Sequence, residues 1–170
     1  MTLLEIDLKK LESNYHSLRE HLNPHTKMIG VVKANAYGSI SGLVAQKLVE
    51  LGIEALAVAY ADEGIQLRQS GVTAPILIFY PQIARFKDII HHNLEPVLYS
   101  KRSWVKFAEQ TQAEQKSAYP IHVKYNTGLN RIGFDPNETD WVLGQLKNSP
   151  FQIKSVYTHL GQTESPKPDA

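Results

Sequence analysis

Residues 55–79 decide the fold of this chain: Ala55-Leu56-Ala57-Val58-Ala59, a helical stretch over 61–70 closed by Gly71, and Pro75-Ile76-Leu77-Ile78-Phe79. Both five-residue runs are apolar on both faces, which is typical of strands in a parallel sheet whose two faces are covered. The stretch between them has the spacing of an amphipathic helix. Residues 55–79 therefore predict a strand, a helix and a second strand parallel to the first.

The same alternation of strand and helix recurs along the chain. Strands are expected at 4–8, 28–32, 55–59, 75–79, 95–99, 120–124 and 153–159. Helices are expected at 9–22, 43–51, 61–70, 82–92, 101–115 and 137–147, with a loop rich in Gly and Ser at 35–42. The strictly sequential order of six strand–helix units favours a (β/α) barrel over a doubly wound sheet.

The number of units is too small for a closed barrel. A complete barrel has eight units, typically in about 250 residues, whereas this chain has 170 residues. We therefore expect an α/β fold, a parallel (β/α) TIM-type barrel truncated at about six of its eight units. A complete flavodoxin-like domain is the alternative that the pattern leaves open.

Composition excludes several functional classes. A total of 18 Lys and Arg against 17 Asp and Glu gives a net charge of +1, which argues against binding to nucleic acid or to an anionic membrane surface. The absence of Cys excludes disulfides, thiolate metal sites and cysteine nucleophiles, and it suits a reducing cytosol. The sequence has no apolar signal core in its first twenty residues, no apolar run of membrane-spanning length and no metal-ligand spacing. A cytoplasmic protein without a bound metal is expected.

Lys33 is the first candidate for chemistry, because barrel active sites lie at the C-terminal ends of the strands. It follows four apolar residues, so its amine is expected to emerge from a largely desolvated barrel mouth. Desolvation lowers the pKa of an amine, and a neutral amine is what Schiff-base chemistry requires. Tyr37 offers a hydroxyl donor nearby, and Gly38 allows a positive φ angle. A surface lysine on an ordinary turn is the alternative.

The stretch from Lys124 to Phe134 is the second candidate. Its glycines have P-loop-like spacing, but Phe134 and Asp135 stand where Lys and Ser or Thr are needed, so a nucleotide site is rejected. Arg131 in this loop could bind a substrate carboxylate through paired hydrogen bonds, and a surface arginine on a turn is the alternative. Lys124 shares a strand face with His122, and an inner-face lysine needs a partner or a modification.

Three segments together resemble a known family. Val31-Val32-Lys33-Ala34-Asn35-Ala36-Tyr37-Gly38 and Asn126-Thr127-Gly128-Leu129-Asn130-Arg131-Ile132-Gly133-Phe134 resemble the two most diagnostic segments of alanine racemase. Tyr157-Thr158-His159-Leu160 resembles a third, and the order and spacing match along nearly all of the chain. The resemblance implies a homodimeric bacterial enzyme that racemises L-alanine to D-alanine for peptidoglycan synthesis. It also implies a (β/α)₈ barrel followed by a mainly β domain, with pyridoxal 5′-phosphate as the cofactor.

The resemblance carries over residue by residue. Lys33 matches the lysine that binds the cofactor covalently and acts as one acid/base, and Tyr37 matches a tyrosine that hydrogen-bonds the cofactor phosphate. Arg131 matches the arginine that contacts the phenolate side of the cofactor and the substrate carboxylate. Lys124 matches a lysine that is often carbamylated, which would make it an anion that supports Arg131. His159 matches a histidine that supports the arginine at the pyridine nitrogen.

The resemblance also implies what these 170 residues do not contain. Residues 1–170 are expected to be a partial N-terminal barrel without the C-terminal β domain. The second base of the family is a tyrosine from that domain of the partner subunit, so this piece alone is expected to be inactive. Ser39-Ile40 stands where His-Gly is usual, Asn126 replaces an aspartate, and Gly161 replaces a residue such as alanine.

Two segments indicate a subgroup of the family, and two alternative functions stay open. Ala57–Gly64 and Asn93–Pro96 look closest to racemases fused behind a ligase that joins D-alanyl-D-alanine to a UDP-muramoyl tripeptide. One alternative is a non-catalytic barrel protein that binds pyridoxal phosphate for homeostasis, although such proteins lack the Lys-Ala-Asn-Ala-Tyr-Gly segment and the arginine loop. The other is an α/β domain with a structural role.

Overall fold

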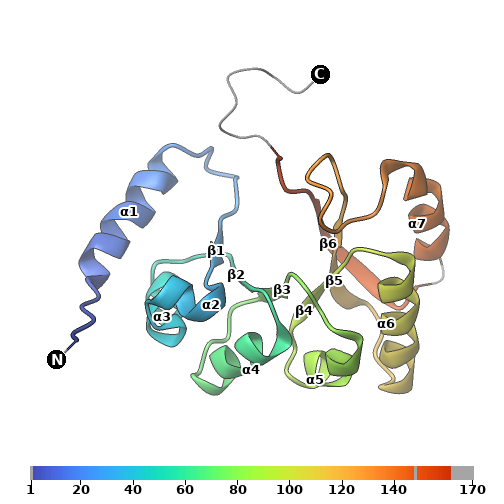
Figure 1. Cartoon of the computed structure of the whole chain (residues 1–170), viewed down its shortest axis with the longest axis horizontal. Helices are drawn as coiled ribbons and strands as arrows, with labels where there is room; N and C mark the ends of the chain where they lie inside the picture. The colour runs from blue at the N-terminus through green and yellow to red at the C-terminus, as the bar shows by residue number, and fades with distance from the viewer. Residues whose placement is uncertain (1, 148, 162–170) are drawn as a thin grey trace. The chain divides into compact units, whose positions relative to one another are not determined.

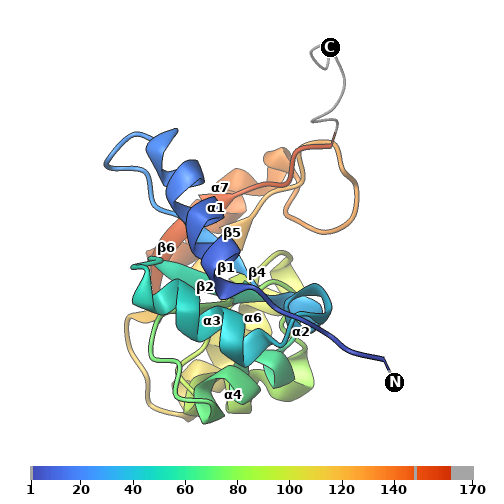
Figure 2. The ribbon, with the colours of Figure 1, turned by 90° about the vertical axis from the view of Figure 1, so that its left-hand side faces the viewer.

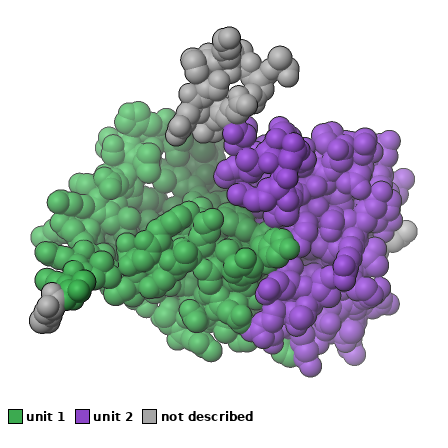
Figure 3. Space-filling model, in the orientation of Figure 1, with its two compact units in different colours: residues 1–80, 91–94 green, residues 81–90, 95–170 purple. Residues whose placement is uncertain are grey.

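The computed structural model describes residues 2–147 and 149–161. The chain divides into two compact units, Met1–Tyr80 with His91–Leu94 and Pro81–Ile90 with Glu95–Ala170 (Figure 3). Within the described residues, no helix combines the length and the apolar character needed to span a membrane.

Unit 1 contains three parallel strands in chain order and four helices (Figure 1). Its strands are β1 (Ile29–Val31), β2 (Ala55–Val58) and β3 (Ile76–Ile78), and its helices are α1 (Leu8–Glu20), α2 (Lys33–Gly38), α3 (Ser41–Glu50) and α4 (Ala61–Gln69). Gly30 pairs with Leu56, and Ala57 pairs with Leu77. Strands β2 and β3 are almost wholly buried, as expected for strands covered on both faces. Helices α1 and α3 both face the viewer in Figure 2, and the ion pair Lys47–Glu12 (2.7 Å) joins them.

Unit 2 contains the other three parallel strands, again in chain order. Its strands are β4 (Glu95–Leu98), β5 (Tyr119–Lys124) and β6 (Phe151–Tyr157), and its helical segments are η1 (Ile83–Arg85), α5 (Phe86–His91), α6 (Lys101–Ala113), η2 (Pro136–Glu138) and α7 (Thr139–Leu146). Aromatic side chains dominate its core. The Trp104 ring on α6 lies 5.3 Å from Phe151 on β6 and 6.1 Å from Trp141 on α7, measured between ring centroids. Such edge-to-face pairs add about 0.5–1.5 kcal/mol each to the burial of the rings.

The six strands from 28–32 onward are confirmed, but the strand expected at 4–8 is wrong. The Asp7 carboxylate accepts hydrogen bonds from the backbone N–H groups of Lys9 and Lys10, at 3.0 and 3.1 Å, and so begins α1. Leu3 and Leu4 are exposed. The alternating pattern of 4–8 therefore precedes a helix cap, and residues 2–7 form no strand.

The loop expected at 35–42 is also different in the structure. Its first part belongs to α2, and α3 already begins at Ser41. Helix α2 has an unusual backbone, with positive φ angles at residues 34–37.

Candidate active site

A left-handed turn follows Lys33. Residues 34–37, Ala-Asn-Ala-Tyr, have φ angles of 51–55° and ψ angles of 37–47°. For a residue with a side chain, the left-handed conformation costs roughly 1–2 kcal/mol because Cβ approaches the following carbonyl oxygen. Four consecutive non-glycine residues in this conformation must be held by their surroundings.

Hydrogen bonds at both ends hold this turn. Val32, whose N–H donates to the Ala57 carbonyl at 2.9 Å, continues the β1–β2 pairing, and its own carbonyl accepts the Ala36 N–H at 3.0 Å. Beyond the turn, the Asn35 side-chain oxygen accepts the Ser41 N–H at 2.8 Å, which ties the turn to the start of α3. The turn is therefore anchored to both β1 and α3.

The carboxylate of Glu63 provides a further anchor. One oxygen accepts the Ala34 N–H at 2.6 Å, and the other accepts the N–H groups of Ala59 and Tyr60 at 2.8 and 2.9 Å. Our sequence reasoning did not identify Glu63. Glu63 is the third residue of the helix predicted at 61–70, a position from which a Glu side chain can reach back to the N–H group of the residue before the helix, although Tyr60 is not a typical capping-box residue. The contact with Ala34, 29 positions away in the sequence, has no such signal.

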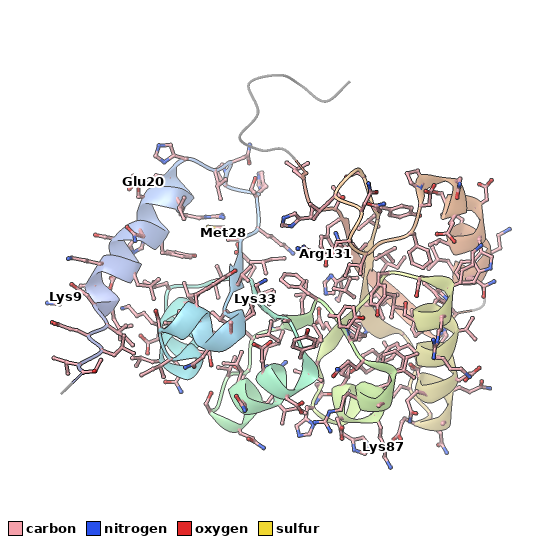
Figure 4. The ribbon with its side chains drawn as sticks, viewed as in Figure 1. Lys9, Glu20, Met28, Lys33, Lys87 and Arg131 are labelled. Atoms are coloured by element: carbon pink, nitrogen blue, oxygen red, sulfur yellow. The ribbon has the colours of Figure 1, made fainter. Side chains whose placement is uncertain are left out.

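Lys33 itself is half-buried at the C-terminal end of β1. Its Nζ lies 5.9 Å from the centroid of the Tyr37 ring, and the Tyr37 side chain is 69% exposed. Figure 4 shows the Lys33 side chain leaving the chain between β1 and α2. An amine and a phenol are thus presented together by one short turn.

Lys124, the last residue of β5, is only 4% exposed. Its Nζ lies 5.2 Å from the centroid of the Tyr157 ring on β6. Burial, and secondarily the positive charge of Arg131, lowers the pKa of Lys124 below its ordinary value. Burial also raises the pKa of the Tyr157 phenol, so this side chain stays neutral at physiological pH.

The loop after β5 carries Arg131, which is exposed (Figure 4). The Asn126 side chain folds the loop: its oxygen accepts the Asn130 N–H and its amide donates to the Asn130 side-chain oxygen, both at 2.9 Å. The loop closes where the Phe134 N–H donates to the Lys124 carbonyl at 2.8 Å. The Asn126 side chain therefore orders this loop.

Residues that follow β6 contact the same loop. The hydroxyl groups of Thr127 and Thr158 lie 2.6 Å apart, and Thr158 also donates to the Tyr125 carbonyl at 2.9 Å. His159 follows directly and is exposed. These contacts join the ends of β5 and β6 beside Arg131.

A polar cluster surrounds His122, which lies two residues before Lys124 on β5. His122 is 4% exposed, and its ring nitrogens contact the Glu95 carboxylate on β4 at 2.8 Å and the Ser155 hydroxyl on β6 at 2.7 Å. The cluster joins three adjacent strands through side chains as well as through backbone hydrogen bonds. The two-residue spacing predicted that His122 shares a strand face with Lys124. The partners of His122, Glu95 and Ser155, were not predicted, because they depend on the register of β4 and β6.

The predicted site residues thus fall into two sets. Lys33 and Tyr37 lie together in unit 1, and Lys124, Arg131 and His159 lie in unit 2. Each set stands at the C-terminal end of its strands, where sites form in α/β barrels.

Comparison with known families identifies the family of this chain. A family model described as the N-terminal domain of alanine racemase matches residues 6–170. The chain belongs to this family. An alanine racemase from a Nostoc species is 35% identical over 171 aligned residues, which is 97% of this chain. One from Methanococcus maripaludis is 34% identical over 95% of the chain.

Solved alanine racemase structures have the same fold. The enzyme from Clostridium difficile 630 superposes on 90% of this chain with a TM-score of 0.85 and 33% sequence identity. The enzyme from Corynebacterium glutamicum superposes on 95% with a TM-score of 0.86 and 28% identity. The fold is therefore that of the N-terminal barrel of alanine racemase, truncated. The chain spans 44% of the length of the Nostoc and Methanococcus relatives and 41% of the Clostridium chain.

Proposed function

We propose that this chain is the barrel part of an alanine racemase that uses pyridoxal 5′-phosphate to interconvert L- and D-alanine. The observation that carries the proposal is the amine of Lys33, presented beside Tyr37 on a left-handed turn at the end of β1, in a chain that matches the family over residues 6–170. Energetically unfavourable backbone of this kind clusters at functional sites.

The side chains present fit this cofactor. Pyridoxal phosphate has an aldehyde, which an amine can bind covalently, and an anionic phosphate, which needs hydrogen-bond donors. Lys33 would hold the aldehyde end, and the exposed phenol of Tyr37 would donate to the phosphate. When bound, the cofactor supplies an electron sink for the substrate α-carbon.

The residues of the chain would then move one proton and fix the substrate. Lys33 Nζ, when neutral, can take the α-proton of alanine on one face and can return a proton to that face. Arg131 would bind the substrate carboxylate with its guanidinium group, since paired hydrogen bonds of this kind fix orientation. His159 would support the arginine that faces the pyridine nitrogen. Inversion requires a second acid/base on the opposite face, which we assign to the partner subunit.

Lys124 is proposed to carry a carbamate. Its lowered pKa makes the neutral amine more abundant, and only the neutral amine can bond to carbon dioxide. The ammonium group loses one proton, and the resulting amine forms an N–C bond to carbon dioxide and loses a second proton, so that the cation becomes an anion. The like-charge repulsion between Lys124 and Arg131 then becomes attraction, which would steady Arg131.

The wider assignment follows the resemblance of Ala57–Gly64 and Asn93–Pro96 to the fused subgroup. We propose that the racemase is attached to a ligase that acts on D-alanyl-D-alanine. It would work as a homodimer in the bacterial cytoplasm and supply D-alanine for peptidoglycan. Assay of ligase activity in the longest form of the protein that carries these residues tests this assignment.

The attachment site of the cofactor tests the proposed function. The protein is loaded with pyridoxal phosphate, reduced with borohydride and digested, and the labelled lysine is identified by mass spectrometry. The label is expected on Lys33 and is lost in Lys33→Ala, whereas Lys87→Ala, which removes an exposed lysine, keeps it. A label on another lysine would contradict the proposal. Racemisation by the longest form separates a racemase from a non-catalytic cofactor-binding barrel.

A further inference from the structure

We infer that Glu63 is a positioning residue for Lys33, because its carboxylate holds the left-handed turn that presents the amine. The inference rests on the role proposed above for Lys33. Glu63 lies in the first turn of α4 and belongs to the same compact unit as Lys33.

The contacts of Glu63 connect two segments that are far apart in the sequence. One oxygen accepts the N–H of Ala34, the residue next to Lys33, at 2.6 Å. The other oxygen accepts the N–H groups of Ala59 and Tyr60 at the end of β2, at 2.8 and 2.9 Å. A single carboxylate therefore fixes the first left-handed residue against the end of the neighbouring strand.

The chemistry requires a carboxylate at this position. All three partners are N–H donors, and an ionised carboxylate is a pure acceptor that forms stronger hydrogen bonds than a neutral group does. Ala34 has a φ angle of 51°, a conformation that residues with a side chain rarely adopt. A charge-assisted hydrogen bond at this residue opposes its relaxation to the ordinary right-handed conformation.

The direction of the Lys33 side chain depends on this turn. Tyr37 is at the other end of the same four left-handed residues, and its ring lies 5.9 Å from Lys33 Nζ. Relaxation of Ala34 would change the path of the backbone between the two residues. The amine and the phenol would then lose their common orientation.

Glu63→Gln separates this role from simple helix capping. Gln is accepted at the third helical position of a capping box, so its carbonyl can still accept the N–H groups of Ala59 and Tyr60. Its NH₂ group would then face the Ala34 N–H, donor against donor. Glu63→Asp shortens the side chain by one methylene and provides a second variant. Asp62→Asn removes one negative charge from the same turn of α4 and is the matched control.

The test uses amide-resolved hydrogen exchange, borohydride trapping and kinetics on the longest form of the protein. In Glu63→Gln, the exchange of the Ala34 amide is expected to accelerate at least about tenfold, while the Tyr60 amide changes little. Trapped cofactor on Lys33 is expected to fall, and kcat for alanine is expected to fall at least about tenfold with KM less affected. Asp62→Asn should leave all three quantities near those of the wild type.

The outcomes separate this inference from the proposed function. Unchanged Ala34 exchange in both Glu63 variants overturns the inference, as does an equal effect of Asp62→Asn. Faster Ala34 exchange with unchanged trapping and kcat also overturns it, since Glu63 would then stabilise the turn without positioning Lys33. A wild-type protein with no label on Lys33 overturns the proposed function, and with it the catalytic part of the inference, whether or not Ala34 exchange depends on Glu63.

Discussion

The buried amine of Lys124 makes stability depend on pH. Burial and the Arg131 charge lower its pKa in the folded protein, whereas in the unfolded chain its pKa returns to about 10.5. Below the folded-state pKa the amine is protonated in both states, and the folded state bears the unfavourable free energy of a buried cation. As the pH rises through the folded-state pKa towards about 10.5, the folded state releases its proton first, so the free energy of unfolding gains a favourable contribution.

Lys124→Met should remove this contribution. The difference in the free energy of unfolding between wild type and Lys124→Met should therefore shift in favour of wild type as the pH rises from neutral towards about 10.5. Urea denaturation over this range, in buffer free of bicarbonate, measures the shift. Lys87→Met, which removes an exposed lysine, controls for the loss of one positive charge. A difference that stays flat with pH would contradict the lowered pKa.

The sequence alone could predict which side chains lie next to one another only where they are close along the chain. Lys33 and Tyr37 are four residues apart on one turn, so their pairing could be predicted. Two of the three Glu63 contacts, those with Ala59 and Tyr60 at the start of its own helix, could also have been predicted. Its contact with Ala34, like the contacts of His122 with Glu95 and Ser155, depends on how separate strands align. Such pairings are not encoded in any one segment.

Among the loops, residues 125–134 offer a steric test of the Arg131 site. Gly128 and Gly133 both have φ angles in the region that favours glycine, 126° and 138°. A Cβ on Gly133 would lie 2.5 Å from the Asn126 backbone nitrogen and 2.6 Å from the Tyr125 carbonyl carbon, whereas a Cβ on Gly128 would meet nothing within 4 Å. Each Ala substitution should destabilise by about 1–3 kcal/mol through its φ angle. Gly133→Ala should lower the free energy of unfolding by about 1–3 kcal/mol more than this φ effect alone, because the backbone near the new Cβ must shift.

The comparison of these two variants isolates the close backbone approach. Urea midpoints of Gly128→Ala and Gly133→Ala give the two changes in the free energy of unfolding. Equal losses would show that the loop is not packed as described.

Among the strands and helices, the apolar strands were predictable and the irregular segments were not. Strands β2 to β5 have buried runs, as expected for strands in a covered sheet, whereas no residue of β1 or β6 is buried. Residues 4–8 alternate between apolar and acidic side chains, but the Asp7 cap starts a helix there instead of a strand. The left-handed turn of α2 could not be predicted because none of its four residues is glycine. Tertiary contacts, chiefly those of Glu63 and Asn35, select that backbone.

For the whole chain, the proposed mechanism predicts that these 170 residues do not racemise alanine by themselves. Inversion at the α-carbon needs an acid/base on each face, and Lys33 can serve only one of them. The chain spans less than half of its relatives, and the resemblance assigns the second base to the C-terminal domain of a partner subunit. Loss of one acid/base alone typically costs about 10²–10⁴ in rate. The longest form and the 170-residue chain, loaded with cofactor to the same extent at Lys33, should therefore differ by at least that factor. Chiral separation of the alanine formed from pure L-alanine measures both rates, with Lys33→Ala in the longest form as the blank. Comparable rates would mean that a second base lies within these residues, and the assignment of the opposite face to a partner subunit would be wrong.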